Sequence, residues 1–164
     1  LLQKKLKILN KDESVSIYKK LSQLTSECLI ETIEKFSKGN IQQVEQNENE
    51  VSYAKKLIKD DGIIEWKLTS EEIYNKLRAF KTFPGLFTFF NLDQLKIIDG
   101  LPVEMNHNEM PGTILSINDS ILVACGNKTA FLIKYIKKTG KKTLPSNEFL
   151  NGFNLKKGDV FDNN

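Results

Sequence analysis

Four lysines surround a glycine near the end of the chain, in the run Lys137-Lys138-Thr139-Gly140-Lys141-Lys142. Ammonium groups at this density can contact several phosphates of an RNA backbone, because each one neutralises a phosphate and releases a condensed counterion. The alternative is a solvated loop without a binding role, which would have the same composition. The net charge of the whole chain is only +3, yet Glu148 is the sole acid between Lys128 and Lys157. This lysine run, residues 137–142, is therefore the sharpest candidate for binding a polyanion.

Further basic residues lie upstream of the lysine run. We expect Lys55, Lys56 and Lys59 to add to the same RNA-binding surface. Arg78 is a candidate for it as well, although a structural role explains it equally well. Its guanidinium can pair with a nearby carboxylate or stack on Trp66.

Residues suited to acid–base, nucleophilic or metal chemistry have simpler explanations. Glu71-Glu72 falls in the first turn of an expected helix, where negative charge is favourable, and Asp60-Asp61 is expected to shape a turn. His107, the single histidine, is expected in a solvated loop. Cys28 and Cys125 sit in apolar patterns, which favours buried reduced thiols over a disulfide. We expect no catalytic residue and no metal ligand in this chain, because one His and two Cys cannot complete a usual zinc site.

Several aromatic residues between 66 and 90 resemble a base-stacking platform in composition. We assign most of them to the core. Phe87 and Phe89 alternate and should share one face of a strand. Phe83, beside Pro84, is the candidate for an exposed ring.

The elements that position these residues divide the chain. With 164 residues, 40% hydrophobic and 27% charged, it should hold one packed domain plus a smaller piece, and no apolar run is long enough to span a membrane. Residues 5–8 alternate as a strand, and residues 12–38 carry one apolar stripe at helical spacing that ends at Gly39. A single strand and a single helix cannot bury each other's apolar faces. We therefore expect residues 1–39 to have leaned on a larger sheet that precedes this chain.

A polar, amide-rich stretch over residues 40–52 follows and is typical of a linker. Thr69 to Glu72 forms a capping box that should start a helix, which must end before Pro84. Beyond it we expect a short helix at 146–150 and short strands at 86–90, 94–98, 112–118, 121–125 and 129–136. Five short strands predict a small barrel of the OB type, although Tudor-like and SH3-like barrels give nearly the same pattern.

An ordered series of motifs resembles the methionyl-tRNA formyltransferase family over nearly the whole chain. Tyr53-Ala54-Lys55-Lys56 with a later acidic pair and Ile64-Glu65-Trp66 is similar to the family's linker, where Asp usually stands in place of Glu65. Arg78-Ala79-Phe80 with Pro84-Gly85 is similar to its Arg-Ala-Phe-Asn-Pro-Trp-Pro-Gly segment, from which Lys81, Thr82 and Phe83 depart. The later matches, in the family's order and spacing, are Pro111-Gly112-Thr113, Val123-Ala124-Cys125-Gly126, Gly140-Lys141-Lys142 and Phe149-Leu150-Asn151-Gly152.

The resemblance implies an α+β, mainly β fold: an OB-like barrel with flanking helices, preceded by a remnant of a Rossmann-like domain. It implies three parts: residues 1–39 as the end of the catalytic domain, 40–68 as linker, and 69–164 as a tRNA-binding domain. The parent enzyme would transfer a formyl group from 10-formyltetrahydrofolate to initiator methionyl-tRNA in the cytoplasm, during translation initiation. The family's catalytic Asn, His and Asp precede this portion. The fragment is thus expected to bind tRNA, to bind no cofactor, to be monomeric and to be inactive without the missing amino-terminal domain.

Two other functions remain open from the sequence. A stand-alone RNA-binding OB module would share the basic run without an enzymatic parent. Half of a sugar formyltransferase would share the fold but have no affinity for tRNA.

Overall fold

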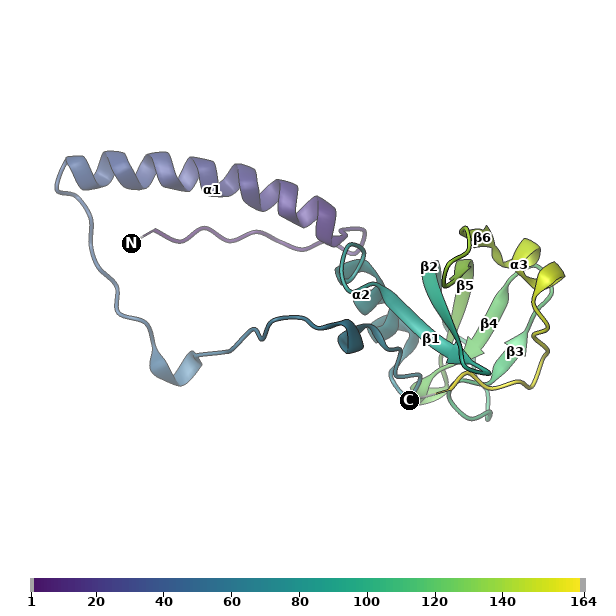
Figure 1. Ribbon diagram of the computed structural model, residues 1–164. Helices are drawn as coiled ribbons and strands as arrows, with labels where there is room; N and C mark the ends of the chain where they lie inside the picture. Colours follow the sequence, from purple (N-terminus) through teal and green to yellow (C-terminus); the bar gives the residue numbers. More distant parts are fainter. Residues whose placement is uncertain (1, 163–164) are drawn as a thin grey trace. The chain divides into compact units, whose positions relative to one another are not determined.

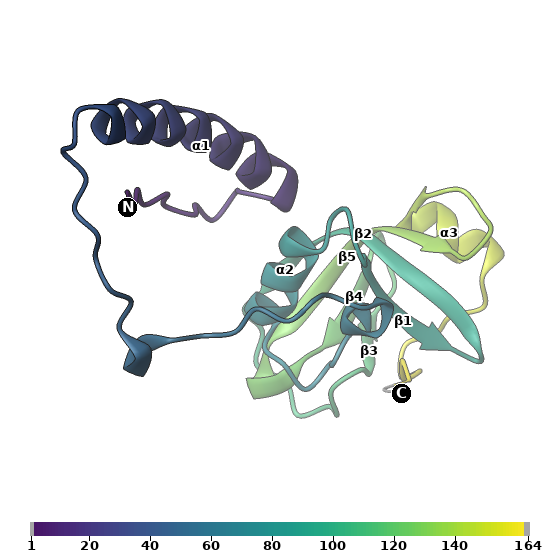
Figure 2. The same ribbon diagram turned by 60° about the vertical axis from the view of Figure 1, so that its left-hand side comes forward.

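The computed structural model describes residues 2–162 of the chain. It comprises two units, an N-terminal unit that ends at Lys56 and a barrel unit that begins at Leu57. The helices and strands of each unit are labelled in Figure 1 and seen from a second direction in Figure 2. None of the helices within residues 2–162 combines the length and the apolarity that crossing a membrane requires.

The N-terminal unit is built on one long helix, α1 (Ser14–Ser37). At its start the Ser16 hydroxyl accepts from the amide of Glu13 at 3.1 Å and donates to Asp12 at 3.0 Å. At its end Gly39 adopts φ +69°, the left-handed conformation that glycine tolerates best. The helix predicted over residues 12–38 is therefore confirmed, together with its termination at Gly39.

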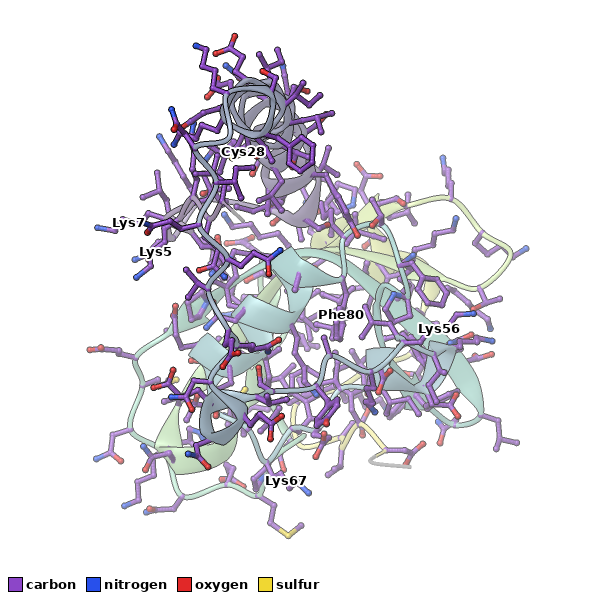
Figure 3. All side chains as sticks on the ribbon, turned by 90° about the vertical axis from the view of Figure 1, so that its left-hand side faces the viewer. Lys5, Lys7, Cys28, Lys56, Lys67 and Phe80 are labelled. Atoms are coloured by element: carbon purple, nitrogen blue, oxygen red, sulfur yellow. The ribbon has the colours of Figure 1, made fainter. Side chains whose placement is uncertain are left out.

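The strand predicted over residues 5–8 is wrong. Residues 2–9 are extended but pair with no strand among the described residues. They run back along α1 in both views (Figures 1 and 2), and an ion pair joins Lys4 to Glu31 at 2.9 Å. Lys5 and Lys7 project away from the segment (Figure 3). The alternation of apolar residues is real, but a strand forms only where a neighbouring strand offers hydrogen bonds.

The apolar side chains of α1 are not covered within the N-terminal unit. No residue of this helix is buried, and Tyr18, Ile33 and Phe36 are among its exposed large side chains. Phe36 is 72% exposed. A helix stripe of this kind is normally buried against another element. The expected partner sheet stays a prediction.

The barrel unit contains a curled antiparallel sheet, a half-barrel in a mixed α/β unit. The strands in order across the sheet are β1-β2-β5-β4-β3, and β6 pairs with β5. Their bounds are β1 Leu86–Phe90, β2 Asp93–Val103, β3 Ile114–Ser116, β4 Ile121–Ala124, β5 Ala130–Lys138 and β6 Leu144–Pro145. The helices of the unit are α2 Ser70–Ala79 and α3 Ser146–Gly152, with 3₁₀ turns η2 Lys59–Gly62 and η3 Gly126–Lys128.

Most predicted elements of this unit are confirmed with shifted ends. The Thr69 hydroxyl accepts from the Glu72 amide at the start of α2, as the capping box predicted. β2 runs beyond the predicted 94–98 because its ladder with β5 continues to Val103. β6 was not predicted, since its two residues carry no periodic signal.

The two edges of the curled sheet are both joined to the C-terminal segment. Asp162 pairs with Phe89 of β1, and Val160 pairs with Thr113 just before β3. Phe161, between them, is fully buried. The last described residues therefore connect opposite edges of the half-barrel.

Trp66 lies at the centre of the core. Its ring stacks on Phe161 with centroids 5.6 Å apart, and its Nε1 donates to the buried Thr88 hydroxyl at 3.1 Å. The amide of Ile64 donates to the carbonyl of Phe87 at 2.8 Å. Residues 64–66, expected in the linker, are thus built into the barrel unit.

Candidate nucleic-acid interface

The lysine run joins the end of β5 to β6 through a turn at Gly140, whose φ is +77°. Successive strand residues point to opposite faces, so Lys137 and Lys138 diverge. Lys137 stands opposite Lys96 of β2, whereas Lys138 stands opposite the buried Leu95. The four lysines therefore do not share a single face.

The ammonium group of Lys138 is engaged in contacts within the barrel unit. Its ammonium contacts the Asp93 carboxylate at 2.6 Å and lies 5.6 Å from the centroid of the Phe153 ring. The ion pair offsets its charge, which lowers what it can offer a phosphate. In contrast, Lys141 and Lys142 are exposed. Within residues 2–162, Lys137, Lys141 and Lys142 form no ion pair.

Lys96 lies next to the lysine run in the sheet, although the sequence did not single it out. It faces Lys137 across the β2–β5 ladder, and like charges directly opposite each other destabilise a sheet. Its side chain crosses Gly85, where an added Cβ would lie 2.6 Å from the Lys96 Nζ. With Lys81 it lines a small hollow of about 80 Å³. The alternation of Lys96 with the apolar Leu95 and Ile97 is the sequence signal that could have placed Lys96 on the outer face.

The other predicted basic residues are distributed over both units. Lys55 and Lys56 belong to the N-terminal unit and are exposed, and Lys59 opens η2 in the barrel unit. Figure 3 labels Lys56. The Arg78 guanidinium lies 5.5 Å from the centroid of the Tyr74 ring and donates to Asn75 at 2.5 Å. The suggested stacking of Arg78 on Trp66 stays a prediction.

His107 is not the solvated residue that the sequence predicted. It is half-buried, and its Nε2 lies 2.7 Å from the carbonyl oxygen of Thr129. The Thr129 hydroxyl in turn accepts from the Ser70 amide at the start of α2. His107 therefore links the loop after β2 to the turn before β5, a role that only the folded chain reveals.

The remaining candidates for chemistry have structural roles. Both cysteines are free, and burial raises the pKa of the Cys125 thiol to about 12. Cys28 is only half-buried, contrary to expectation. Hydrogen bonds from Thr69 lower the pKa of the Glu72 carboxyl, as its capping role requires. Within residues 2–162, His, Cys, Asp and Glu side chains form no group that could hold a metal ion.

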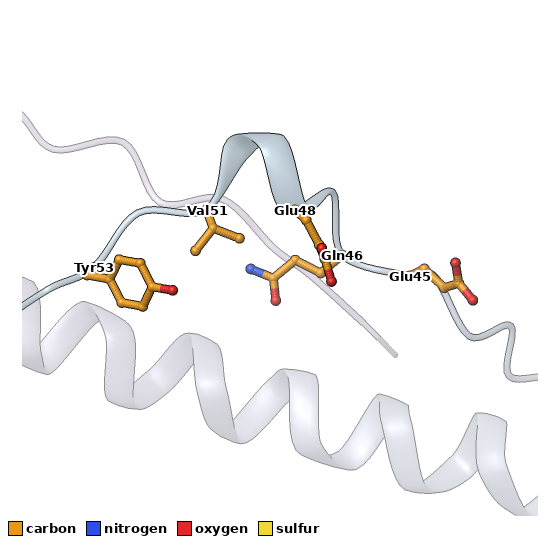
Figure 4. Close-up of a pocket in the computed structure, with 5 residues that line it drawn as sticks. All are labelled: Glu45, Gln46, Glu48, Val51 and Tyr53. Carbon is orange, nitrogen blue, oxygen red and sulfur yellow. The ribbon is translucent and has the colours of Figure 1, made fainter.

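A wide hollow in the N-terminal unit does not suit a polyanion. It measures about 860 Å³ and is lined by Glu45, Gln46, Glu48, Val51 and Tyr53 (Figure 4). Its two carboxylates would repel phosphate. Tyr53 is 95% exposed, so its ring packs on little of the unit. The basic surface of the barrel unit is the better candidate.

The family model described as "Formyl transferase, C-terminal domain" matches residues 56–154. That match covers more than half of the chain and includes almost all of the barrel unit. The N-terminal unit lies outside it except for Lys56.

Curated relatives carry the name methionyl-tRNA formyltransferase. The one from Caldicellulosiruptor saccharolyticus is 33% identical over 162 residues, which cover 98% of this chain and 51% of that protein. The one from Nitrosospira multiformis is 34% identical over 163 residues, covering 99% of this chain and 52% of that protein. This chain thus spans about half the length of the curated relatives it matches.

Solved structures share the fold at low identity. HypX from Aquifex aeolicus in complex with tetrahydrofolic acid matches with a TM-score of 0.58 and 18% identity, covering 97% of this chain and 30% of that one. WlaRD, a sugar 3N-formyl transferase, matches with a TM-score of 0.55 and 17% identity, covering 82% of this chain and 47% of that one.

Proposed function

Since this chain belongs to the formyl transferase C-terminal domain family, we propose that it is the carboxy-terminal part of a methionyl-tRNA formyltransferase. In this proposal the barrel unit holds initiator methionyl-tRNA, and an amino-terminal catalytic domain performs the transfer. The names of relatives that align with nearly the whole chain support the parent activity. The basic surface supports the tRNA-holding role.

The observation that carries the tRNA-holding role is a set of four ammonium groups at one end of the sheet, two on half-buried lysines and two on exposed ones. Lys96 and Lys137 face each other across the ladder, and Lys141 and Lys142 follow in the adjoining turn. None of these four ammonium groups pairs with a carboxylate among the described residues, so their positive charges repel one another. A polyanion relieves that repulsion, and RNA presents phosphates at a spacing that several lysines can meet together.

In the proposed reaction the α-amino nitrogen of methionine esterified to tRNA attacks the formyl carbon of 10-formyltetrahydrofolate. The new bond joins that nitrogen to the formyl carbon, and the bond from the carbon to N10 breaks. The amine loses a proton and N10 gains one. This chain contributes tRNA binding and no catalytic residue, so the chain by itself should transfer no formyl group and bind no folate.

Residues 1–39 are proposed to be the end of the catalytic domain. The uncovered apolar side chains of α1, among them Tyr18, Ile33 and Phe36, would pack against that domain. Burying one such side chain stabilises an interface by roughly 1.5 to 3 kcal/mol. The parent enzyme would act in the cytoplasm as a monomer.

The test is a filter-binding titration of the chain with initiator tRNA at several salt concentrations. The double variant Lys141→Glu/Lys142→Glu should bind at least tenfold more weakly and show a flatter dependence of log affinity on log salt, by about two phosphate contacts. The matched control is Lys156→Glu/Lys157→Glu, which reverses the charge of two adjacent exposed lysines in a different loop. This control should lose less affinity for tRNA than the Lys141→Glu/Lys142→Glu variant.

Two outcomes would contradict the proposal. Equal affinity in the Lys141→Glu/Lys142→Glu variant and the unaltered chain would remove the assigned surface. No measurable affinity of the unaltered chain for tRNA would favour the sugar formyltransferase alternative, for which the likeness to WlaRD gives only a shared fold.

A further inference from the structure

The turn between β1 and β2 contains a leucine in an unfavourable backbone conformation. Asn91 has φ 48° and Leu92 has φ 70°, so both residues of this two-residue turn are left-handed. Such turns match the twist of a hairpin and favour Asn followed by Gly. Asn91 fits this preference, but a bulky side chain at the second position is an outlier.

Packing does not offset the conformational cost at Leu92. The side chain is 97% exposed, so it buries almost no apolar area in this unit. Residues held in rarely populated backbone conformations cluster at functional sites. Leu92 is therefore a candidate for contact with a partner.

The turn at Leu92 lies beside the lysine run. The Thr139 amide donates to the Gln94 carbonyl at 3.1 Å, and its hydroxyl lies 3.2 Å from the Gln94 amide oxygen. One residue away, Lys138 contacts Asp93 at 2.6 Å. That ion pair offsets the charge of Asp93, the first residue of β2 after the turn. The exposed Leu92 thus lies two residues from Gln94, which is hydrogen-bonded to Thr139 of the lysine run.

We propose that Leu92 is an apolar wedge that enters the shallow minor groove of a structured RNA while Lys141 and Lys142 bind the flanking phosphates. This inference rests on the proposed function and adds a contact that is not electrostatic. The minor groove of an RNA helix is wide and shallow and exposes riboses, which an apolar side chain can pack against. Leucine serves as a wedge in other minor-groove proteins. A single apolar side chain beside the lysine run fits this partner better than an apolar protein surface, which requires a broader patch.

The discriminating variant is Leu92→Asn. Asparagine tolerates the left-handed conformation, so the variant should fold at least as stably as the unaltered chain, which a thermal melt checks. Its affinity for initiator tRNA should fall about five- to tenfold, the loss expected from part of one leucine burial. The salt dependence should not change, because no charge is removed. Leu92→Met keeps an apolar side chain and should stay within about twofold of the unaltered chain.

The matched control is Met110→Asn, at an exposed apolar residue in the loop between β2 and β3, which should leave tRNA affinity unchanged. Unaltered tRNA affinity in Leu92→Asn would overturn the wedge, as would an equal loss in Met110→Asn. An equal loss on a single-stranded oligouridine would overturn its assignment to a groove. If the unaltered chain binds tRNA and only the lysine variants weaken it, the wedge fails and the proposed function stands. If the unaltered chain does not bind tRNA, both fail.

Discussion

At the scale of single residues, a buried polar contact links two side chains within the apolar core of the barrel unit. The Trp66 Nε1 donates to the Thr88 hydroxyl at 3.1 Å, and both side chains are fully enclosed. The contact joins the segment before α2 to β1. It lets an amphipathic indole occupy the core, since a buried indole N–H normally needs an acceptor.

We expect Thr88→Val to destabilise the barrel unit by about 1 to 3 kcal/mol, because valine has a similar shape but cannot accept the indole hydrogen bond. Urea denaturation followed by tryptophan fluorescence measures the change, since Trp66 is the only tryptophan. Thr143→Val is the control at an exposed threonine, with an expected change within about 0.5 kcal/mol. Equal stability of Thr88→Val and the unaltered chain would show that this hydrogen bond is energetically neutral.

Single residues also mark the limit of what the sequence predicts at the candidate site. The lysine run was visible from composition. Which of its lysines are ion-paired and which are not was not visible. Lys138 is neutralised by Asp93, a partner 45 positions away in the chain, and no local pattern specifies such a pair. Lys96 was overlooked for the same reason, because its neighbour Lys137 is adjacent only across the β2–β5 ladder.

At the scale of elements, the start of α1 is organised around the carboxylate of Asp12. It accepts from the Lys20 ammonium at 2.6 Å, the Leu9 amide at 2.9 Å and the Ser16 hydroxyl at 3.0 Å. These contacts, led by the hydrogen bond from Lys20, lower the pKa of Asp12 from its ordinary 3.8 to about 2. The carboxylate thus orders the turn that precedes the helix.

The lowered pKa of Asp12 makes the helix start sensitive to acid. A carboxyl that is more acidic in the folded state stabilises it fully above the unfolded pKa, and that stabilisation is lost as the pH falls from about 4 toward 2. Circular dichroism of the unaltered chain should show helicity declining over this range. Asp12→Asn should have lower helicity at neutral pH and a smaller acid-dependent decline.

Some decline should remain in Asp12→Asn, because ion pairs with Lys35 and Lys4 also lower the pKa of Glu31 to about 2. Identical pH profiles for Asp12→Asn and the unaltered chain would exclude Asp12 as the titrating group. The variant Glu31→Gln, with Asp12 intact, separates the two contributions.

The elements that the sequence predicted well are those specified locally. The capping box at Thr69 and Glu72 fixed the start of α2, and Gly39 fixed the end of α1. Elements defined by distant partners were mispredicted. Residues 5–8 carry the pattern of a strand without a partner among the described residues, and β6 exists only because it pairs with β5.

At the scale of the whole molecule, the buried core lies entirely in the barrel unit. Its residues run from Ile64 to Phe161, and none comes from the unit that ends at Lys56. A unit with its own core can fold alone. We therefore expect the barrel unit, but not the N-terminal unit, to fold alone.

A chain restricted to residues 57–164 should melt cooperatively at nearly the same temperature as the intact chain. It should keep most of its salt-dependent affinity for tRNA and lose at most about two phosphate contacts with Lys55 and Lys56. Differential scanning calorimetry measures the melting temperature, and the same filter-binding titration measures the affinity for tRNA. A piece holding residues 1–56 should show no cooperative transition. Failure of the 57–164 piece to fold would mean that the first unit is needed for the second.

The pairing of residues 160–162 with both sheet edges has a consequence during synthesis. β1 leaves the ribosome long before these residues are made, so the nascent chain carries two open edges until they arrive. Exposed edges are prone to pair with other chains, and contacts between residues distant in sequence form slowly. Chaperones that shield nascent chains should therefore raise the yield of this protein chiefly in the interval before residues 160–162 have emerged from the ribosome.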